Sequence, residues 1–178
     1  MIISGRRFNT ILLVAPALAA VLALLWGCQS SKPNPKKVFC TFRVHVEAGN
    51  ETPEHNQQVQ ISRANPVSIN VLKSPILTEA SVKEAKVIEV VGGFALSVRF
   101  DTEGGWLLEQ FSSANIGKHF AIFSQFPIPS KEKLTEGRWL AAPRIHKRIS
   151  DGILIFTPDA TREETDEIAL GLNNLAKK

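Results

Sequence analysis

Apolar residues occupy every second position from residue 38 to residue 46, and mostly polar residues lie between them. The apolar positions of this stretch are Val38, Cys40, Phe42, Val44 and Val46. Because successive side chains of a strand point to opposite faces, the pattern predicts a strand with one buried face. Cys40 lies on that apolar face, where a cysteine behaves as a small buried hydrophobe. His45 lies alone on the polar face and therefore does not indicate a metal site.

Two shorter alternating segments, residues 59–61 and 67–71, follow a polar loop. Asn65 and Pro66 separate them, and this pair favours a break between strands. The pattern predicts a hairpin or meander, so residues 38–75 are interpreted as an N-terminal β segment.

Residues 86–91 and 94–101 are rich in β-forming residues and are separated by Gly92 and Gly93. Two glycines allow the positive φ angles of a tight turn, so this region is predicted to be a β-hairpin. Asp101 is a suitable N-cap for a following helix, which ends near residue 117. Apolar residues at three- and four-residue spacing indicate that helix, namely Leu107, Leu108, Phe111 and Ala114.

The last part of the chain predicts two more strands, at residues 119–126 and 152–157, and a final helix. Thr161 and Glu164 have the spacing of a capping box, and the helix that they open has an apolar face. That face carries Ile168, Leu172 and Leu175. The order β-β-α-β-β-α over residues 76–178 predicts an α+β domain with a mixed or antiparallel sheet and two helices on one face, preceded by the short N-terminal strands.

A long charged segment with two prolines, residues 127–137, connects these late strands. Long loops in compact domains are uncommon and often functional, so one interpretation is a contact loop. The alternative is a solvated extension of a hairpin. The apolar residues expected to form an exposed partner-contact patch there are Phe126, Ile128 and Trp139. Trp139 has a second interpretation, as a core residue beneath the loop.

Residues 1–27 have the layout of a signal peptide. Arg6 and Arg7 precede an apolar run over residues 11–26. This run of 16 residues is shorter than the ~20 residues that a membrane-spanning helix needs, so a signal peptide is favoured over a permanent span.

Gly27 and Cys28 close the apolar run and resemble a bacterial lipobox, in which the cysteine receives diacylglycerol and becomes the new N-terminus. We therefore expect Cys28 to be lipidated, and the alternative is an uncleaved membrane anchor. Residues 28–37 are rich in Ser, Pro, Asn and Lys, which predicts a flexible linker. Gln29 follows the cysteine, and by resemblance to lipoproteins of bacteria with two membranes this favours the outer membrane, with the domain facing the periplasm.

Composition is that of an ordinary globular protein, with 44% hydrophobic residues. The 21 Lys and Arg residues exceed the 17 Asp and Glu residues by four, and loss of Arg6 and Arg7 with the signal peptide leaves a charge of +2. So small a charge does not indicate binding to nucleic acid. Two cysteines and four scattered histidines do not provide a disulfide framework or a closed zinc site.

The sequence contains no constellation of reactive residues that indicates an enzyme, a cofactor or a small-molecule substrate. It has neither a nucleophile elbow nor a glycine-rich phosphate loop. The acidic residues at positions 163–167 are explained by the dipole of the last helix. The basic segment at residues 144–148 is interpreted as a solvated strand end, with a small edge for anionic lipid or an acidic partner as the alternative.

Residues 76–175 also resemble a known family. The matching features are the strand over residues 94–100, the helix end Asn115-Ile116-Gly117-Lys118, the strand Phe120-Ala121-Ile122-Phe123, the segments Ala141-Ala142-Pro143-Arg144-Ile145 and Ile149-Ser150-Asp151-Gly152, and the helix from Thr161 with Glu163-Glu164. Together they resemble the head subdomain of the first large extracytoplasmic domain of SecD, the accessory subunit of the bacterial protein-export translocase. These motifs are mainly glycines, prolines and core aliphatic residues, so they report a fold rather than a catalytic site.

The sequence departs from SecD at two points. The long segment over residues 125–138 replaces a tight turn, and the SecD membrane helices that couple translocation to the proton gradient do not follow before Lys178. The resemblance implies a membrane-tethered binding head without coupling activity, which contacts exported polypeptides or an export or envelope complex. The alternative is a structural or assembly component of the envelope, in which a free edge of the strand at residues 38–46 pairs with a partner strand.

Overall fold

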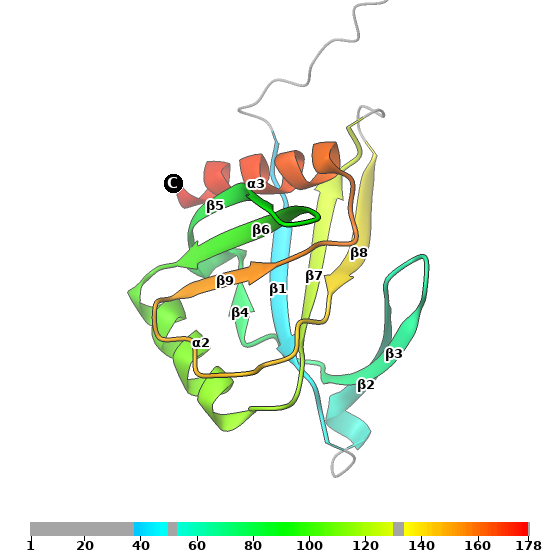
Figure 1. Cartoon of the computed structure of the whole chain (residues 1–178), viewed down its shortest axis with the longest axis vertical. Coiled ribbons are helices and arrows are strands. Elements are labelled where there is room, and N and C mark those ends of the chain that lie inside the picture. The colour runs from blue at the N-terminus through cyan, green and yellow to red at the C-terminus, as the bar shows by residue number, and fades with distance from the viewer. Residues whose placement is uncertain (1–37, 50–52, 130–133, 178) are drawn as a thin grey trace, which may run out of the picture. The chain divides into compact units, whose positions relative to one another are not determined.

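The computed structural model describes residues 38–49, 53–129 and 134–177 (Figure 1). These residues form antiparallel strands and two α-helices, which confirms the predicted α+β class. The strands are β1 (Thr41–Val46), β2 (Asn56–Ile61), β3 (Val67–Leu72), β4 (Leu77–Thr78), β5 (Val82–Val90), β6 (Gly93–Phe100), β7 (Phe120–Pro127), β8 (Thr135–Ala141) and β9 (Ile153–Phe156). The helices are α2 (Thr102–Ala114) and α3 (Arg162–Ala176), with 3-10 turns η4 (Pro53–His55) and η5 (Glu79–Ser81). The predicted signal peptide at residues 1–27 and the predicted lipidated cysteine and linker at residues 28–37 lie outside the described residues.

The strands are divided between two sheets and a separate hairpin. One sheet has the order β4-β1-β7-β8, the other has the order β5-β6-β9, and β2 pairs only with β3. All of these pairings are antiparallel. Because β1 lies inside the first sheet, residues 38–75 and 76–178 together form one compact unit.

The predicted buried face of the first strand is confirmed. All five of its apolar residues are at most 4% exposed, namely Val38, Cys40, Phe42, Val44 and Val46. This face belongs to the main core, where the Cys40 thiol donates a hydrogen bond to the carbonyl of Ile168 in α3 at 3.3 Å. Burial raises the pKa of the Cys40 thiol to about 12, so the thiol stays protonated and is a core group rather than a nucleophile.

His45 is buried, although the alternation places it on a polar face. Its side chain is only 4% exposed, because the β2–β3 hairpin and Trp139 cover this end of β1. The Nδ1–H of His45 donates to the carbonyl of Leu72 at 2.8 Å, and its ring meets Trp139 edge-on at 5.2 Å between centroids. A second small core lies here, formed by Val59, Ile61 and Val71 of the hairpin together with Ala121 of β7. The polar face of β1 is therefore solvent-facing only in part.

Acidification is expected to destabilise the fold through His45. Burial lowers the pKa of its imidazole, and nearby Arg43 lowers it further, although the hydrogen bond to the Leu72 carbonyl opposes both effects. The unfolded chain therefore binds a proton near pH 6.5 while the folded chain does not, so the free energy of unfolding falls as the pH drops below about 6.5. Urea unfolding at pH 7.5 and pH 5.5 measures this loss. The His45→Gln variant should lose less stability between the two pH values, and an equal loss in both proteins would contradict this origin.

The two ends of the segment predicted as a long loop, residues 127–137, belong to paired β-strands, and its residues 130–133 lie outside the described residues. Strand β7 continues to Pro127, β8 begins at Thr135, and these two residues face each other across the hairpin. The structure thus supports the alternative interpretation, a hairpin extension. Strand β8 has a weak sequence signal because it includes Gly137, and glycine has a low strand preference. Glycine is favoured at this position because a Cβ would lie 3.0 Å from the ring of Phe123.

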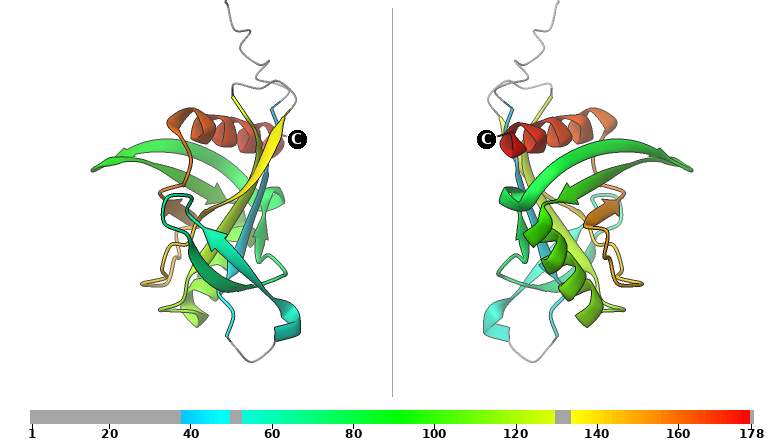
Figure 2. Two further views of the ribbon diagram at one scale, coloured as in Figure 1. Left: turned by 90° about the vertical axis from the view of Figure 1, so that its right-hand side faces the viewer. Right: turned by 90° about the vertical axis from the view of Figure 1, so that its left-hand side faces the viewer.

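Both predicted helix starts are confirmed. The Asp101 carboxylate accepts a hydrogen bond from the backbone of Gly104 at 2.7 Å, and Thr161 and Glu164 make both bonds of a capping box. Helix α3 lies along β5 at one edge of the second sheet (Figure 2). The Asn173 amide there accepts from the N–H of Ala85 at 2.9 Å and donates to its carbonyl at 2.8 Å. This side chain takes the place of a partner strand, so the β5 edge is occupied at this point.

Candidate functional site

The three predicted contact residues do not form one exposed patch. Phe126 is completely buried, with the guanidinium of Arg138 5.3 Å from its ring centroid, so the prediction that it lies at the surface is wrong. The reason is the alternation along β7, which turns Phe126 toward the core. Trp139 is half-buried, with its ring edge-on to Phe123 at 5.4 Å, and Ile128 is half-buried as well.

A hollow lies where the edges of the two sheets approach each other. This hollow, the β8–β9 groove, has a volume of about 490 Å³ and is lined by Ile61, Ser62, Leu140, Ala141, Ala142, Pro143, Phe156, Thr157, Pro158 and Asp159. Strand β8 is the outer strand of the first sheet, and β9 is the outer strand of the second. Most of the lining is aliphatic, aromatic or proline, so the groove presents an apolar surface.

A smaller hollow continues along the same side of β9. This hollow, the Ile145 pocket, has a volume of about 190 Å³ and is lined by Phe120, Pro143, Arg144, Ile145, His146, Lys147, Ile149, Leu154 and Ile155. Pro143 contributes to both hollows, so they are neighbours along the edge of β9. Both hollows have apolar residues from β9 and from the segment between β8 and β9, and further ones come from β2 and β8 in the groove and from β7 in the Ile145 pocket.

The outer edge of β9 carries backbone groups that do not bond to β6. Gly152 and Phe100 face each other, and the N–H of Phe100 donates to the carbonyl of Gly152 at 3.0 Å. Because hydrogen-bonded pairs alternate along an antiparallel ladder, Leu154 and Phe156 bond to β6, while Ile153 and Ile155 direct their N–H and C=O groups outward. The N–H of Ile153 is satisfied by the Asp151 side chain at 3.1 Å. Ile155 is 53% exposed and lines the Ile145 pocket, so its outward N–H and C=O belong to an exposed residue beside an apolar hollow.

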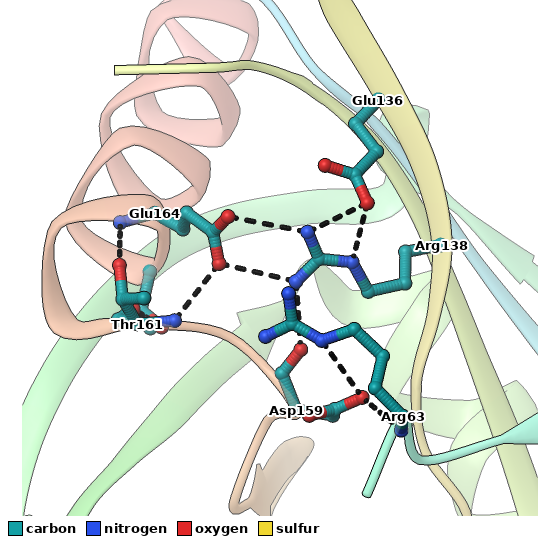
Figure 3. Close-up of polar contacts among 7 residues, drawn as sticks. Arg63, Glu136, Arg138, Asp159, Thr161 and Glu164 are labelled. Carbon is teal, nitrogen blue, oxygen red and sulfur yellow. Dashed lines mark hydrogen bonds and ion pairs between the residues drawn. The ribbon is translucent and has the colours of Figure 1, made fainter. Parts of the chain in front are cut away.

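A buried ion pair holds the wall of the β8–β9 groove in place (Figure 3). Arg138 of β8 makes two hydrogen bonds of 3.1 Å to the carboxylate of Glu164 in α3. Arg138 also donates to Glu136 at 2.9 Å and to the carbonyl of Asp159 at 2.9 Å. The backbone N–H of Asp159 in turn donates to the carbonyl of Leu140 at 2.7 Å. These bonds fix the segment that leads from β9 to α3 against β8.

The same network ties the β2–β3 hairpin to this wall. The backbone N–H of Arg63, in the turn of the hairpin, donates to the Asp159 carboxylate at 2.8 Å, and the side chain of Arg63 lies 3.5 Å from it. Burial alone would lower the pKa of Arg138, but its bonds to Glu164 and Glu136 raise it overall. Burial would likewise raise the pKa of Glu164, but hydrogen bonds from Arg138 and the Thr161 backbone lower it overall. Both groups are therefore charged at neutral pH.

The basic segment predicted at residues 144–148 lies at the rim of the Ile145 pocket. Arg144 donates to the carbonyl of Gly117 at 3.0 Å, and Arg148 pairs with Glu109 of α2. His146 and Lys147 are exposed. The segment is thus an irregular, positively charged border beside β9, rather than the end of a strand.

Comparison with known families agrees with this architecture. The family model "SecDF, P1 head subdomain" matches residues 54–176, which is more than half of the chain. The chain belongs to this family. The SecDF P1 head match begins in η4, so it includes the β2–β3 hairpin as well as the segment in which the sequence resemblance was found.

The individual proteins that are similar to this chain are also SecDF proteins. Protein translocase subunit SecDF of Thermus thermophilus is 32% identical over 104 residues, which cover 58% of this chain and 13% of that protein. A solved structure described as "Structure and function of a membrane component SecDF that enhances protein export" has a TM-score of 0.52 at 17% identity and covers 97% of this chain and 72% of that chain. This level of identity establishes a common fold. The matched segment spans only 13% of the length of the Thermus thermophilus SecDF protein.

Within residues 38–49, 53–129 and 134–177, no group of three or more His, Cys, Asp or Glu side chains is placed to hold a metal ion. Neither helix in this part of the chain is long and apolar enough to cross a membrane.

Proposed function

We propose that this SecDF P1 head-like chain is a non-enzymatic, membrane-tethered module that binds extended segments of exported polypeptides. The observation that carries this proposal is the outer edge of β9, where the exposed Ile155 directs its N–H and C=O away from β6 beside the apolar Ile145 pocket. The relationship to SecDF supports a role connected with protein export.

The chemistry of such an edge suits an unfolded chain. A polypeptide that pairs with the outward N–H and C=O of Ile155 forms main-chain hydrogen bonds, which do not depend on its sequence. Alternate side chains of an added strand face the same side, so apolar residues of the bound segment reach the β8–β9 groove and the Ile145 pocket. Affinity from the backbone and weak selection for apolar side chains fit a module that must accept many different polypeptides.

The tether belongs to the same proposal. Signal cleavage before Cys28 and lipidation of this cysteine place the domain in the cell envelope, facing the periplasm, with the outer membrane favoured over the inner membrane. A lipid anchor keeps the β9 edge in the periplasm, the compartment that exported chains enter. The expected partners are polypeptides in an extended state or the export machinery itself.

The alternative role as an assembly component relied on a free edge of β1. The structure places β1 between β4 and β7. Beyond the short β4, the N–H of Phe42 donates to the Glu79 carboxylate at 2.9 Å, and the carbonyl of Val38 accepts a hydrogen bond from Asn174 at 2.9 Å. These contacts occupy the side of β1 that a partner strand would need, so the β9 edge is the better candidate.

The Ile155→Pro substitution tests the polypeptide-binding proposal. Proline removes the outward N–H at residue 155 and leaves the bonds between β9 and β6 intact, since edge strands tolerate proline at outward-facing positions. The full chain is titrated against a fluorescein-labelled, permanently unfolded protein, and binding is followed by fluorescence anisotropy. We expect at least a tenfold weaker affinity for Ile155→Pro.

The matched control is Ile155→Thr, which shortens the side chain but keeps the N–H and the strand preference. It should retain most of the affinity, and thermal unfolding checks that both variants are folded. Equal binding by wild type and a folded Ile155→Pro variant would exclude strand addition at β9. Absence of binding by the wild type would contradict the proposed function as a whole.

A further inference from the structure

A strongly basic hollow lies on another part of the domain, at the end of α3. This basic hollow has a volume of about 600 Å³ and is lined by Lys83, Glu84, Ala85, Lys86, Arg99, Asn173, Ala176 and Lys177. It contains four cationic side chains and one carboxylate. None of its cationic residues contributes to the β8–β9 groove or to the Ile145 pocket.

The single carboxylate does not neutralise the basic hollow. Glu84 lies 2.8 Å from the Lys86 ammonium and 3.8 Å from Nε of Arg99. The hydrogen bond from Lys86 lowers the pKa of Glu84, so this carboxylate is ionised and already shared between two cations. Within the described residues, no carboxylate lies within ion-pair distance of Lys83 or Lys177. A net positive charge therefore faces the solvent, and it matches an anionic surface.

The position of the basic hollow indicates which anionic surface it meets. The described chain begins at Val38, whose carbonyl accepts a hydrogen bond from the Asn174 side chain at 2.9 Å. Asn173, in the last turns of α3, and Lys177, the C-cap of this helix, line the basic hollow. Figure 1 shows the start of β1 and the C-terminal end of the chain on the same side of the domain. The first described residue, Val38, thus lies near the end of α3 at which the basic hollow is found.

The length of the tether limits how far this side lies from the membrane. A chain extends by at most about 3.5 Å per residue, so the ten residues 28–37 cannot place Val38 more than roughly 35 Å from Cys28. Charges act only within about 8–10 Å at physiological salt, so attraction requires the domain to touch the surface, which this linker permits. This step rests on the proposed lipid anchor at Cys28.

We propose that the basic hollow formed by Lys83, Lys86, Arg99 and Lys177 docks on the head groups of anionic phospholipids and holds the tethered domain against the membrane in one orientation. Each lysine near an anionic surface strengthens binding by about fivefold. Loss of two lysines is therefore expected to reduce the docking equilibrium constant by about 25-fold.

The experiment uses the full lipidated chain in vesicles of phosphatidylcholine, with or without 30% phosphatidylglycerol. A fluorescent label at Ala176→Cys reports contact with the membrane through quenching by a nitroxide lipid, and Ile116→Cys, whose position is outside the basic hollow, is the control label. The buried Cys40 thiol does not compete for the label. We expect strong quenching at residue 176 only in the phosphatidylglycerol vesicles, and much less in the Lys83→Gln/Lys86→Gln variant or at high salt.

The matched control is Lys73→Gln/Lys118→Gln, which removes the same charge from two exposed lysines outside the basic hollow and should leave the quenching unchanged. Equal quenching in both vesicle types, or an equal loss in both double variants, would overturn the proposal. Vesicle flotation separates this result from failure of the tether. Flotation with neutral vesicles without quenching at residue 176 overturns lipid docking alone, whereas flotation only with phosphatidylglycerol supports docking and contradicts the anchor. Flotation with neither type contradicts both.

Discussion

The Arg138→Met variant is expected to lower the free energy of unfolding by about 3 kcal/mol. Arg138 is only 8% exposed, and its guanidinium is bonded to Glu164, Glu136 and the carbonyl of Asp159. Methionine fills much of the same space but leaves the Glu164 carboxylate, in a residue 9% exposed, without its cation. Removal of one member of a buried ion pair costs far more than removal of an exposed one, because the remaining charge is still desolvated.

Equilibrium unfolding in urea measures this effect at pH 7. The double variant Arg138→Met/Glu164→Leu removes both charges, so it is expected to recover part of the lost stability. Arg63→Gln is the exposed control, since the Arg63 side chain is 55% exposed and lies 3.5 Å from Asp159, and its loss should stay below about 1 kcal/mol. A double variant as unstable as the sum of its single variants would show that the pair itself is not the source of the effect.

The ion pair also gives the variant a pH signature. The pKa of Glu164 is lower in the folded protein than its ordinary value, so the pair stabilises the fold above about pH 4.5 and loses this contribution as the pH falls further. In Arg138→Met the carboxylate lacks its main stabilising bonds. The difference in stability between wild type and variant should therefore shrink as the pH is lowered below 4.5.

Local patterns were sufficient to predict many elements of this fold. The alternation at residues 38–46, the β-hairpin around Gly92 and the capping box at Thr161 each depend on neighbours in the sequence, and the structure confirms all three. The turn itself lies one residue earlier than predicted, because Gly93 already pairs with Val90 and the two turn residues are Val91 and Gly92. Long-range packing was not predictable in the same way. His45 follows the polar half of an alternating pattern and is buried only because a hairpin from residues 56–72 covers it.

The candidate site shows the same division. The sequence predicts a strand at residues 152–157, but its position at the edge of a sheet depends on which strands pair, and that is decided by the whole chain. Phe126 was expected at the surface because it adjoins charged residues, whereas continuation of β7 to Pro127 gives it a core-facing position. A partial signal for the Arg138 network existed in Glu164, which serves both the capping box and the ion pair.

Phe42→Ala is expected to have the largest effect on stability, a loss of about 4 kcal/mol. Phe42 is completely buried in β1, and its ring lies 6.4 Å from that of Phe100 in β6 and 6.3 Å from that of Phe156 in β9, measured between centroids. Its ring therefore connects the first sheet to both the central strand and the outer strand of the second sheet. Alanine removes this contact and leaves a cavity that the two sheets can close only by moving together.

Urea unfolding compares Phe42→Ala with Val67→Ala, a truncation at a residue that is 58% exposed and expected to cost less than about 0.5 kcal/mol. A loss near 1 kcal/mol for Phe42→Ala would mean that the sheets close over the cavity.

The contact of Phe42 with both sheets also predicts an effect on polypeptide binding that is separate from the loss of stability. Because β9 belongs to the second sheet and the wall of the β8–β9 groove to the first, a shift between the sheets alters the groove even in molecules that remain folded. In the absence of urea, where circular dichroism shows a folded protein, Phe42→Ala should therefore bind the labelled unfolded protein more weakly than the wild type. Val67→Ala should bind it as the wild type does.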